Sequence, residues 1–186
     1  MTYGLPESLN VAGREYQINT DFRCMFDIFE VLNDVELEDR ERGYLALGFF
    51  YKDVASIPSA DYREAIQKMF WFIRGGKDDD GQQSKKKMLD WEHDYPLIIA
   101  PVNHVVGREI RELEHFHWWT FLSAFMEIGE KCTFSQVLHI RQMRANGKRL
   151  DKSDAEWYRK NRDLVDLPQT YTEAENDLLN QWGGGD

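Results

Sequence analysis

Apolar residues recur through most of the chain at intervals of three and four, the period of an α-helix that is buried along one side. The clearest example spans residues 62–73, where the apolar positions are Tyr62, Ala65, Ile66, Met69, Phe70 and Ile73. Pro58 and Ser59 precede this stretch, and Gly75-Gly76 follows it. Because proline stops a helix, serine caps the next one and glycine ends it, we predict a helix over 62–73.

Similar stripes predict further helices that begin after Thr20 or Asp21, near Asp39, near Leu97, at Thr133 or Ser135, and at Asp151 or Ser153. The first has an apolar stripe of Phe22, Met25, Phe26, Phe29 and Leu32. The second, over 39–52, carries Leu45 and Phe49 on one side and Tyr44, Leu47 and Tyr51 on the other. The helix after Thr133 or Ser135 is expected to bury Phe134, Val137, Leu138 and Met143. Extended-type residues flank Ala12-Gly13 instead, which predicts a short β-hairpin: Leu9, Val11, Tyr16 and Ile18.

Residues 107–128 contain the most apolar stretch of the chain, with two adjacent tryptophans at Trp118 and Trp119. Read as one helix, this stretch is apolar on nearly every side, so we expect it in the middle of a helical bundle. Its one polar or small seam would consist of His117, Thr120, Ala124 and Glu127.

These elements predict a mainly α fold: a single-domain helical bundle over 1–165 with an N-terminal hairpin (1–20). The length of 186 residues and the 42% hydrophobic content are sufficient for a core of that kind. Glycine and charged residues without apolar ones predict a mobile loop at 75–87. Residues 166–186 are predicted to form an acidic, flexible tail.

The formal charge is −10, from 33 acidic and 23 basic residues, which argues against general nucleic-acid binding. Residues 27–41 hold seven acidic residues against Arg40 alone, whereas residues 141–162 hold eight basic and three acidic ones. Opposite charges on one chain favour contacts between copies, so we expect a homo-oligomer. No apolar run approaches the roughly 20 residues of a membrane span, which predicts a cytoplasmic protein.

Candidate catalytic chemistry is sparse. His115 and His117 would point about 200° apart on a helix, so they would not share a metal ion unless the backbone there were extended. The segment 90–94 is rich in acid-base groups but has no nucleophile beside it, and no nucleophile elbow, zinc-protease motif or dinucleotide fingerprint occurs. Cys24 and Cys132 lack partners at metal or redox spacing and are expected in the core. We therefore expect no catalytic residue, no metal and no cofactor, and a protein that is not an enzyme.

Four segments together resemble the bacteriophage gp-fifteen family of siphophages that infect Gram-positive bacteria. They are Ile18-Asn19-Thr20-Asp21-Phe22-Arg23, Phe70-Trp71-Phe72-Ile73-Arg74-Gly75-Gly76-Lys77, Asp90-Trp91-Glu92-His93-Asp94 and His117-Trp118-Trp119-Thr120-Phe121. Their order and spacing match the family pattern over about residues 8 to 145. The chain departs from that pattern at three positions: Phe116 replaces leucine, Trp91 replaces phenylalanine, and Thr120 stands where lysine is common.

The resemblance implies a tail assembly chaperone that binds the tape measure protein, and also the tail-tube protein, in the host bacterial cytoplasm and is absent from the mature virion. A long amphipathic chain aggregates unless its apolar face is covered, and a helix-binding groove would cover it. Tail chaperones of this kind are often made in two lengths by ribosomal frameshifting, and the three glycines before Asp186 could be encoded by a run of G that slips. The gene sequence, rather than the protein sequence, decides whether a longer form exists.

Four aromatic residues are candidates for partner binding: Tyr44, Tyr51, Trp71 and Trp182. The family motif residues His117, Trp118, Trp119 and Phe121 are instead expected in the core. Two other functions stay open, a structural component of the tail or connector and an acidic mimic of DNA that binds a host enzyme. The basic segment 141–162 argues against the mimic.

Overall fold

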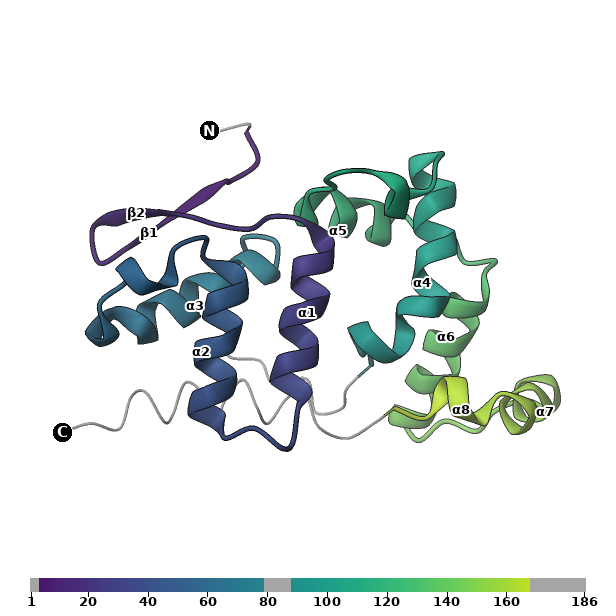
Figure 1. Cartoon of the computed structure of the whole chain (residues 1–186). Helices are drawn as coiled ribbons and strands as arrows, with labels where there is room; N and C mark the ends of the chain where they lie inside the picture. The colour runs from purple at the N-terminus through teal and green to yellow at the C-terminus, as the bar shows by residue number, and fades with distance from the viewer. Residues whose placement is uncertain (1–3, 79–87, 168–186) are drawn as a thin grey trace. The chain divides into compact units, whose positions relative to one another are not determined.

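The computed structural model describes residues 4–78 and 88–167, and within these ranges the fold is mainly α with one two-stranded antiparallel sheet (Figure 1). The predicted fold class is therefore confirmed. The described residues divide into two compact units: unit 1 comprises 4–78 and 114–122, and unit 2 comprises 88–113 and 123–167. The single domain over 1–165 stays a prediction. Most of the predicted mobile loop and nearly all of the predicted tail, including Trp182, lie outside the described residues.

The predicted hairpin is present at the start of unit 1. Strands β1 (Ser8–Val11) and β2 (Arg14–Gln17) pair so that Leu9 lies opposite Tyr16. Ala12 and Gly13 form the turn with φ values of 49° and 81°, the positive values that a two-residue hairpin turn requires. The chain then continues to Ile18, which pairs with Tyr51 as an isolated bridge.

Three helices complete most of unit 1: α1 (Phe22–Asn33), α2 (Asp39–Phe50) and α3 (Tyr62–Ile73). The Asp21 carboxylate caps α1 by accepting a hydrogen bond from the Arg23 amide. Asp21 was one of the two residues predicted to cap this helix. Helix α3 has the predicted bounds. Helices α1 and α2 pack against each other, and Figure 1 shows them side by side.

The prediction of one helix over 107–128 is wrong. Only its second part is helical, as α5 (Trp118–Met126), and a short 3₁₀ turn occupies Ile110–Glu112. The stretch just before α5 is extended, because Asp21 and His117 form an antiparallel bridge. The four residues of the expected polar seam do not share one environment. His117 and Ala124 are buried, whereas Thr120 and Glu127 are exposed.

Unit 2 contains α4 (Trp91–Val106), α6 (Thr133–Ala145), α7 (Lys152–Lys160) and α8 (Arg162–Val165). Helix α4 begins six residues earlier than predicted, because the Asp90 carboxylate accepts the amide of His93 and caps it there. Pro96 and Pro101 both lie inside α4. Each removes one amide donor from the helix without ending it.

The small core of unit 2 consists of Val137, Ile140 and Val165, with partly buried apolar side chains around it: Leu97, Leu150, Trp157, Tyr158 and Leu164. Helix α6 buries Phe134 and Val137 as predicted, but the other two buried positions are Ile140 and Arg141 rather than Leu138 and Met143. None of the helices in 4–78 and 88–167 has the length and apolar content to cross a bilayer.

Candidate functional site

The motif over 18–23 and the residues before α5 are joined by backbone hydrogen bonds. The amide of Phe22 donates to the Phe116 carbonyl at 3.0 Å, and the amide of Trp118 donates to the Thr20 carbonyl at 2.7 Å. The Asp21 carboxylate accepts the Phe116 amide at 2.8 Å, in addition to capping α1. These bonds hold residues 116 and 117 extended, which explains why the apolar stretch becomes helical only from Trp118.

Both tryptophans at the start of α5 attach to the end of α3. The indole nitrogen of Trp118 donates to the Ile73 carbonyl, and that of Trp119 donates to the Phe72 carbonyl, each at 2.8 Å. The last carbonyls of a helix lack amide partners one turn further along the helix, so both indoles donate where α3 ends. The Phe72 carbonyl also accepts the Gly75 amide at 3.0 Å, so Trp119 adds a second donor there. Trp118 is fully buried, and its ring stacks on Phe121 at 5.3 Å between centroids.

Gly76 allows the close approach of Trp119 to the end of α3. A Cβ at Gly76 would lie 2.9 Å from Cη2 of Trp119, and the glycine has φ of +82°. Both the space and the backbone conformation therefore require glycine at this position. The Gly75-Gly76 pair does end α3 as predicted, and it also accommodates an aromatic ring from a segment distant in sequence.

His117 has a partner on each ring nitrogen. Nδ1 accepts the backbone amide of Trp119 at 3.0 Å, so Nε2 carries the proton and donates to the Pro6 carbonyl at 3.2 Å. Burial lowers the pKa of His117, because its charged form is desolvated. With both nitrogens engaged by the chain, His117 serves as a neutral structural group.

The sequence allowed His115 and His117 to share a metal ion only if the backbone between them were extended. The backbone before α5 is extended, and the two ring centroids are 6.3 Å apart. His115 Nε2, however, lies 3.0 Å from the Thr20 hydroxyl. Within 4–78 and 88–167 no three His, Cys, Asp or Glu side chains are grouped in a way that could hold a metal ion.

The third family motif, 90–94, contributes to a buried ion pair in unit 2. Asp94 and Arg141 have side chains that are 0% and 5% exposed, and their two hydrogen bonds measure 2.7 and 2.8 Å. Arg141 also donates to the carbonyls of Met88, Leu164 and Val165, which uses all five of its N–H groups. The basic segment 141–162 was expected at the surface, and for Arg141 this expectation is wrong. Arg141 is buried inside unit 2, where it joins α4, α6 and α8. The available signal was its place on the apolar stripe of α6, four residues after Val137.

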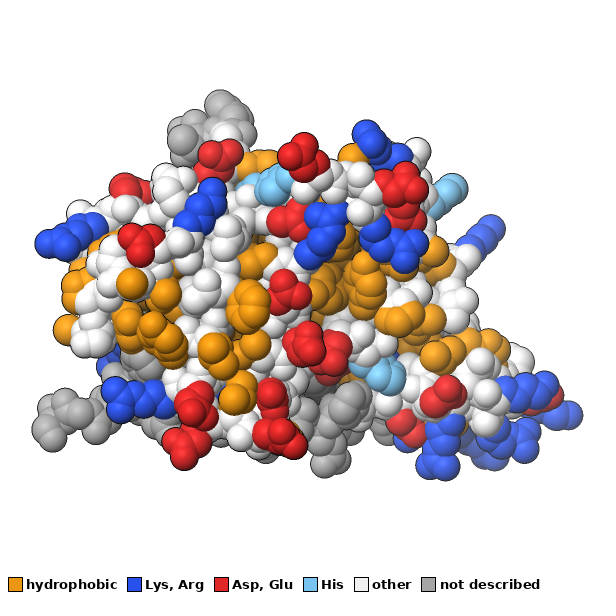
Figure 2. All heavy atoms as spheres, viewed as in Figure 1, with side chains coloured by type: hydrophobic (Ala, Val, Ile, Leu, Met, Phe, Trp, Pro, Cys, Tyr) orange, Lys and Arg blue, Asp and Glu red, His pale blue; other side chains and the backbone are white. Residues whose placement is uncertain are grey.

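Two of the predicted partner-binding residues prove not to be freely exposed. Tyr51 is 1% exposed and its hydroxyl donates to the Ala65 carbonyl, so the prediction is withdrawn for Tyr51. Trp71 is half-buried against Trp119. Tyr44 is 46% exposed on α2, where Figure 2 shows hydrophobic side chains gathered. Partner binding by Tyr44 and Trp71 stays a prediction.

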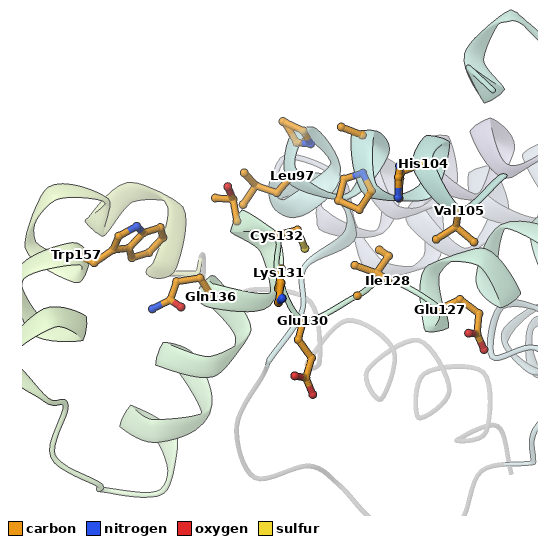
Figure 3. Close-up of a pocket in the computed structure, with 15 residues that line it drawn as sticks. Leu97, His104, Val105, Glu127, Ile128, Glu130, Lys131, Cys132, Gln136 and Trp157 are labelled. Carbon is orange, nitrogen blue, oxygen red and sulfur yellow. The ribbon is translucent and has the colours of Figure 1, made fainter. Parts of the chain in front are cut away.

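Unit 2 carries an open groove of about 1060 Å³ along one side of α4 (Figure 3). Six residues of α4 line it: Pro96, Leu97, Ala100, Pro101, His104 and Val105. The opposite wall comes from residues 127–133 and Gln136, and Trp157 of α7 lies at one end in Figure 3. Apolar side chains from α4 and Ile128 thus face a groove whose ionic groups are Glu127, Glu130 and Lys131.

Taken together, the described residues form a mainly α protein. The motif residues His117, Trp118 and Phe121 are buried as predicted, whereas Trp119 is only half-buried. The chain belongs to the family described as Bacteriophage Gp15 protein, whose model matches residues 1–167. It is therefore a bacteriophage protein, and the family suggests a structural or tail-related one. Comparison with the curated proteins and with the solved structures gave no significant match.

Proposed function

We propose that the protein is a tail assembly chaperone that binds apolar helical segments of the tape measure protein and keeps them soluble until the tail tube surrounds them. Family membership supports a tail-related role, and the groove of unit 2 is the observation that carries the finer proposal. Its α4 wall runs from Pro96 to Val105, a length of about 14 Å at 1.5 Å per residue. A wall of that length matches roughly two and a half turns of a bound helix.

The chemistry of the groove suits an amphipathic helix. Leu97, Val105 and Ile128 offer apolar contacts, and Glu130 and Lys131 add one charge of each sign to the lining. Helix-in-groove binding of this kind uses residues at intervals of three and four on the bound helix. The long apolar stripe of a tape measure protein would present such intervals repeatedly, so several copies of the chaperone would bind along it.

Co-expression with the tape measure protein of the same phage tests the proposal. We expect the tape measure protein to remain in the soluble fraction and to co-purify with several copies of this chain, counted by light scattering. Without this chain it should be insoluble. If the tape measure protein is equally soluble alone, or never co-purifies, the chaperone proposal fails.

Two groove substitutions locate the binding site. Ala100→Glu and Val105→Glu place a charge on exposed positions that line the groove, so the fold should be kept while binding is lost. Met126→Glu is the matched control, because Met126 is 67% exposed and does not line the groove. Loss of co-purification with Met126→Glu but not with the groove variants would place binding elsewhere.

A chaperone leaves the particle, whereas a structural component stays in it. Mass spectrometry of purified virions should therefore lack peptides of this chain while detecting the tail-tube protein. Peptides at the level of a tail component would favour the structural alternative instead.

A further inference from the structure

The outward side of α2 in unit 1 carries a second apolar surface. Tyr44, Leu45 and Phe49 are 46%, 40% and 41% exposed and lie on the outward side of the helix. The expectation that Tyr44 shares a side with Leu47 is therefore wrong, because Leu47 is buried. The opposite side buries Ala46, Leu47 and Phe50. Helix α2 is thus apolar on both sides, although only one side contributes to the core of unit 1. We call the exposed side, Tyr44 to Phe49, the α2 stripe.

Gly48 leaves a gap in the middle of the α2 stripe. A Cβ at this position would meet nothing within 4 Å. Small residues allow the backbone of a partner to come close, as at tightly packed helix crossings. Packing among residues 4–78 and 88–167 gives no reason for glycine here, and a helix interior normally disfavours it.

The α2 stripe continues onto its neighbours. The ring of Tyr62, at the start of α3, lies 5.9 Å from that of Tyr44. On α1, the Cys24 thiol donates to the Phe49 carbonyl at 3.2 Å. The apolar area is therefore wider than one helix face.

Acidic residues surround one end and one side of the α2 stripe. Asp27 and Glu30 are exposed on α1, and further exposed acidic residues lead into α2: Asp34, Glu36, Glu38 and Glu41. Glu38 and Glu41 form a capping box, which fixes both at the start of α2. Arg42 pairs with Asp39, and Arg40 is the one other basic residue in this segment. Figure 2 shows the acidic groups at the lower end of α1 and α2, beside the hydrophobic area.

We propose that the α2 stripe binds an amphipathic helix whose apolar face is bordered by lysine and arginine. The apolar face would cover Tyr44, Leu45 and Phe49, and the basic border would meet the acidic residues of 27–41. Because charges at the edge of an interface steer association, binding is expected to weaken as salt increases. The surface differs from the groove of unit 2, and the inference does not depend on the tape measure protein being the partner.

Designed peptides test the inference on the full chain. The probe is a fluorescent helix of about 18 residues, or five turns, with a leucine stripe bordered by lysines. A second peptide has glutamates in place of the lysines. We expect the lysine-bordered peptide to bind, the glutamate-bordered one to bind at least about tenfold more weakly, and fluorescence anisotropy to show release at high salt.

Substitutions in the chain identify the surface. Tyr44→Ser, Leu45→Ser and Phe49→Ser combined should weaken binding of the lysine-bordered peptide at least about tenfold, with an unchanged circular dichroism spectrum. The matched control combines Leu5→Ser and Met126→Ser, which also removes exposed apolar side chains but outside both the α2 stripe and the groove. Gly48→Gln gives a second variant, because it blocks the gap without removing an apolar contact.

The competing outcomes are distinct. If Ala100→Glu and Val105→Glu abolish peptide binding and the triple serine variant does not, the peptide binds the groove and the inference is wrong. If the lysine-bordered and glutamate-bordered peptides bind equally, charge complementarity is refuted. If the triple serine variant instead converts an oligomer to a monomer in light scattering and no peptide binds the native chain, a second copy occupies the stripe, which also overturns the proposal.

Discussion

The largest fully buried side chains of unit 1 are aromatic, whereas the α4–α6 contact of unit 2 encloses the charged pair Asp94–Arg141. Aromatic packing depends on shape and area, and two indole hydrogen bonds add direction to it in unit 1. A buried ion pair depends on having both partners, because one charge alone in the interior is strongly unfavourable. The two units should therefore respond differently to loss of a single side chain.

The largest effect is expected from Arg141→Met in unit 2. It removes the guanidinium from three carbonyls and from the Asp94 carboxylate, which keeps the Asp90 amide as a donor but loses its opposite charge. This should lower the free energy of unfolding by about 3–5 kcal/mol. Chemical denaturation measures the loss, and hydrogen exchange should show faster exchange in α6 and α8 than in α3. The double variant Asp94→Leu/Arg141→Met should recover part of the stability. A loss below about 1 kcal/mol for Arg141→Met would contradict the role given to the pair.

The next largest effect tests the close contact in unit 1. Gly76→Ala imposes a positive φ on alanine and a Cβ 2.9 Å from Trp119, so we expect a loss of about 2–4 kcal/mol. Gly13→Ala is a matched control, because Gly13 has nearly the same φ, +81°, and nothing within 4 Å. The control should cost about 1–2 kcal/mol. Equal losses for the two variants would show that contact with Trp119 does not constrain Gly76.

A smaller effect concerns the pH dependence of unit 1. Since the pKa of His117 is lowered in the folded state, the unfolded chain binds its proton first as pH falls. The contribution of His117 to stability is complete above its unfolded pKa of about 6.5 and is lost as pH falls through the folded value. Unfolding measured between neutral and mildly acidic pH should show a shallower pH dependence for His117→Gln. An unchanged slope would mean that other groups cause the dependence.

The smallest expected effect is a gain. Gly48→Ala should raise the free energy of unfolding by about 0.5–1 kcal/mol, because alanine favours the helix and its Cβ meets nothing within 4 Å. The same variant should weaken binding of the lysine-bordered peptide if the gap admits a partner backbone. Thermal unfolding and anisotropy measure the two quantities separately. A destabilised Gly48→Ala would show that the gap is needed by the fold itself.

The sequence alone determined those elements whose causes are local. Helix α3 follows from its apolar period between Ser59 and the Gly75-Gly76 pair, and the hairpin follows from alternation around Ala12-Gly13. The capping role of Asp21 was also accessible, because a carboxylate before an apolar stripe satisfies free amides within a few residues.

Other features depend on partners far away in the sequence. Residues 107–117 have a helical apolar period, yet residues 116 and 117 are extended. Hydrogen bonds between 116–118 and residues 20–22 hold them so. Asp21 and Phe116, which form one of these bonds, are 95 residues apart in the sequence. Arg141 looked like a surface charge, and only the folding of α4 and α8 around α6 gives it Asp94 and three carbonyls as partners. Tyr51 is likewise buried, and its hydroxyl donates to the carbonyl of Ala65 on α3. Local periodicity gives the preference of a segment for helix or strand, but hydrogen-bond partners distant in the chain decide where a helix starts and which charges are buried.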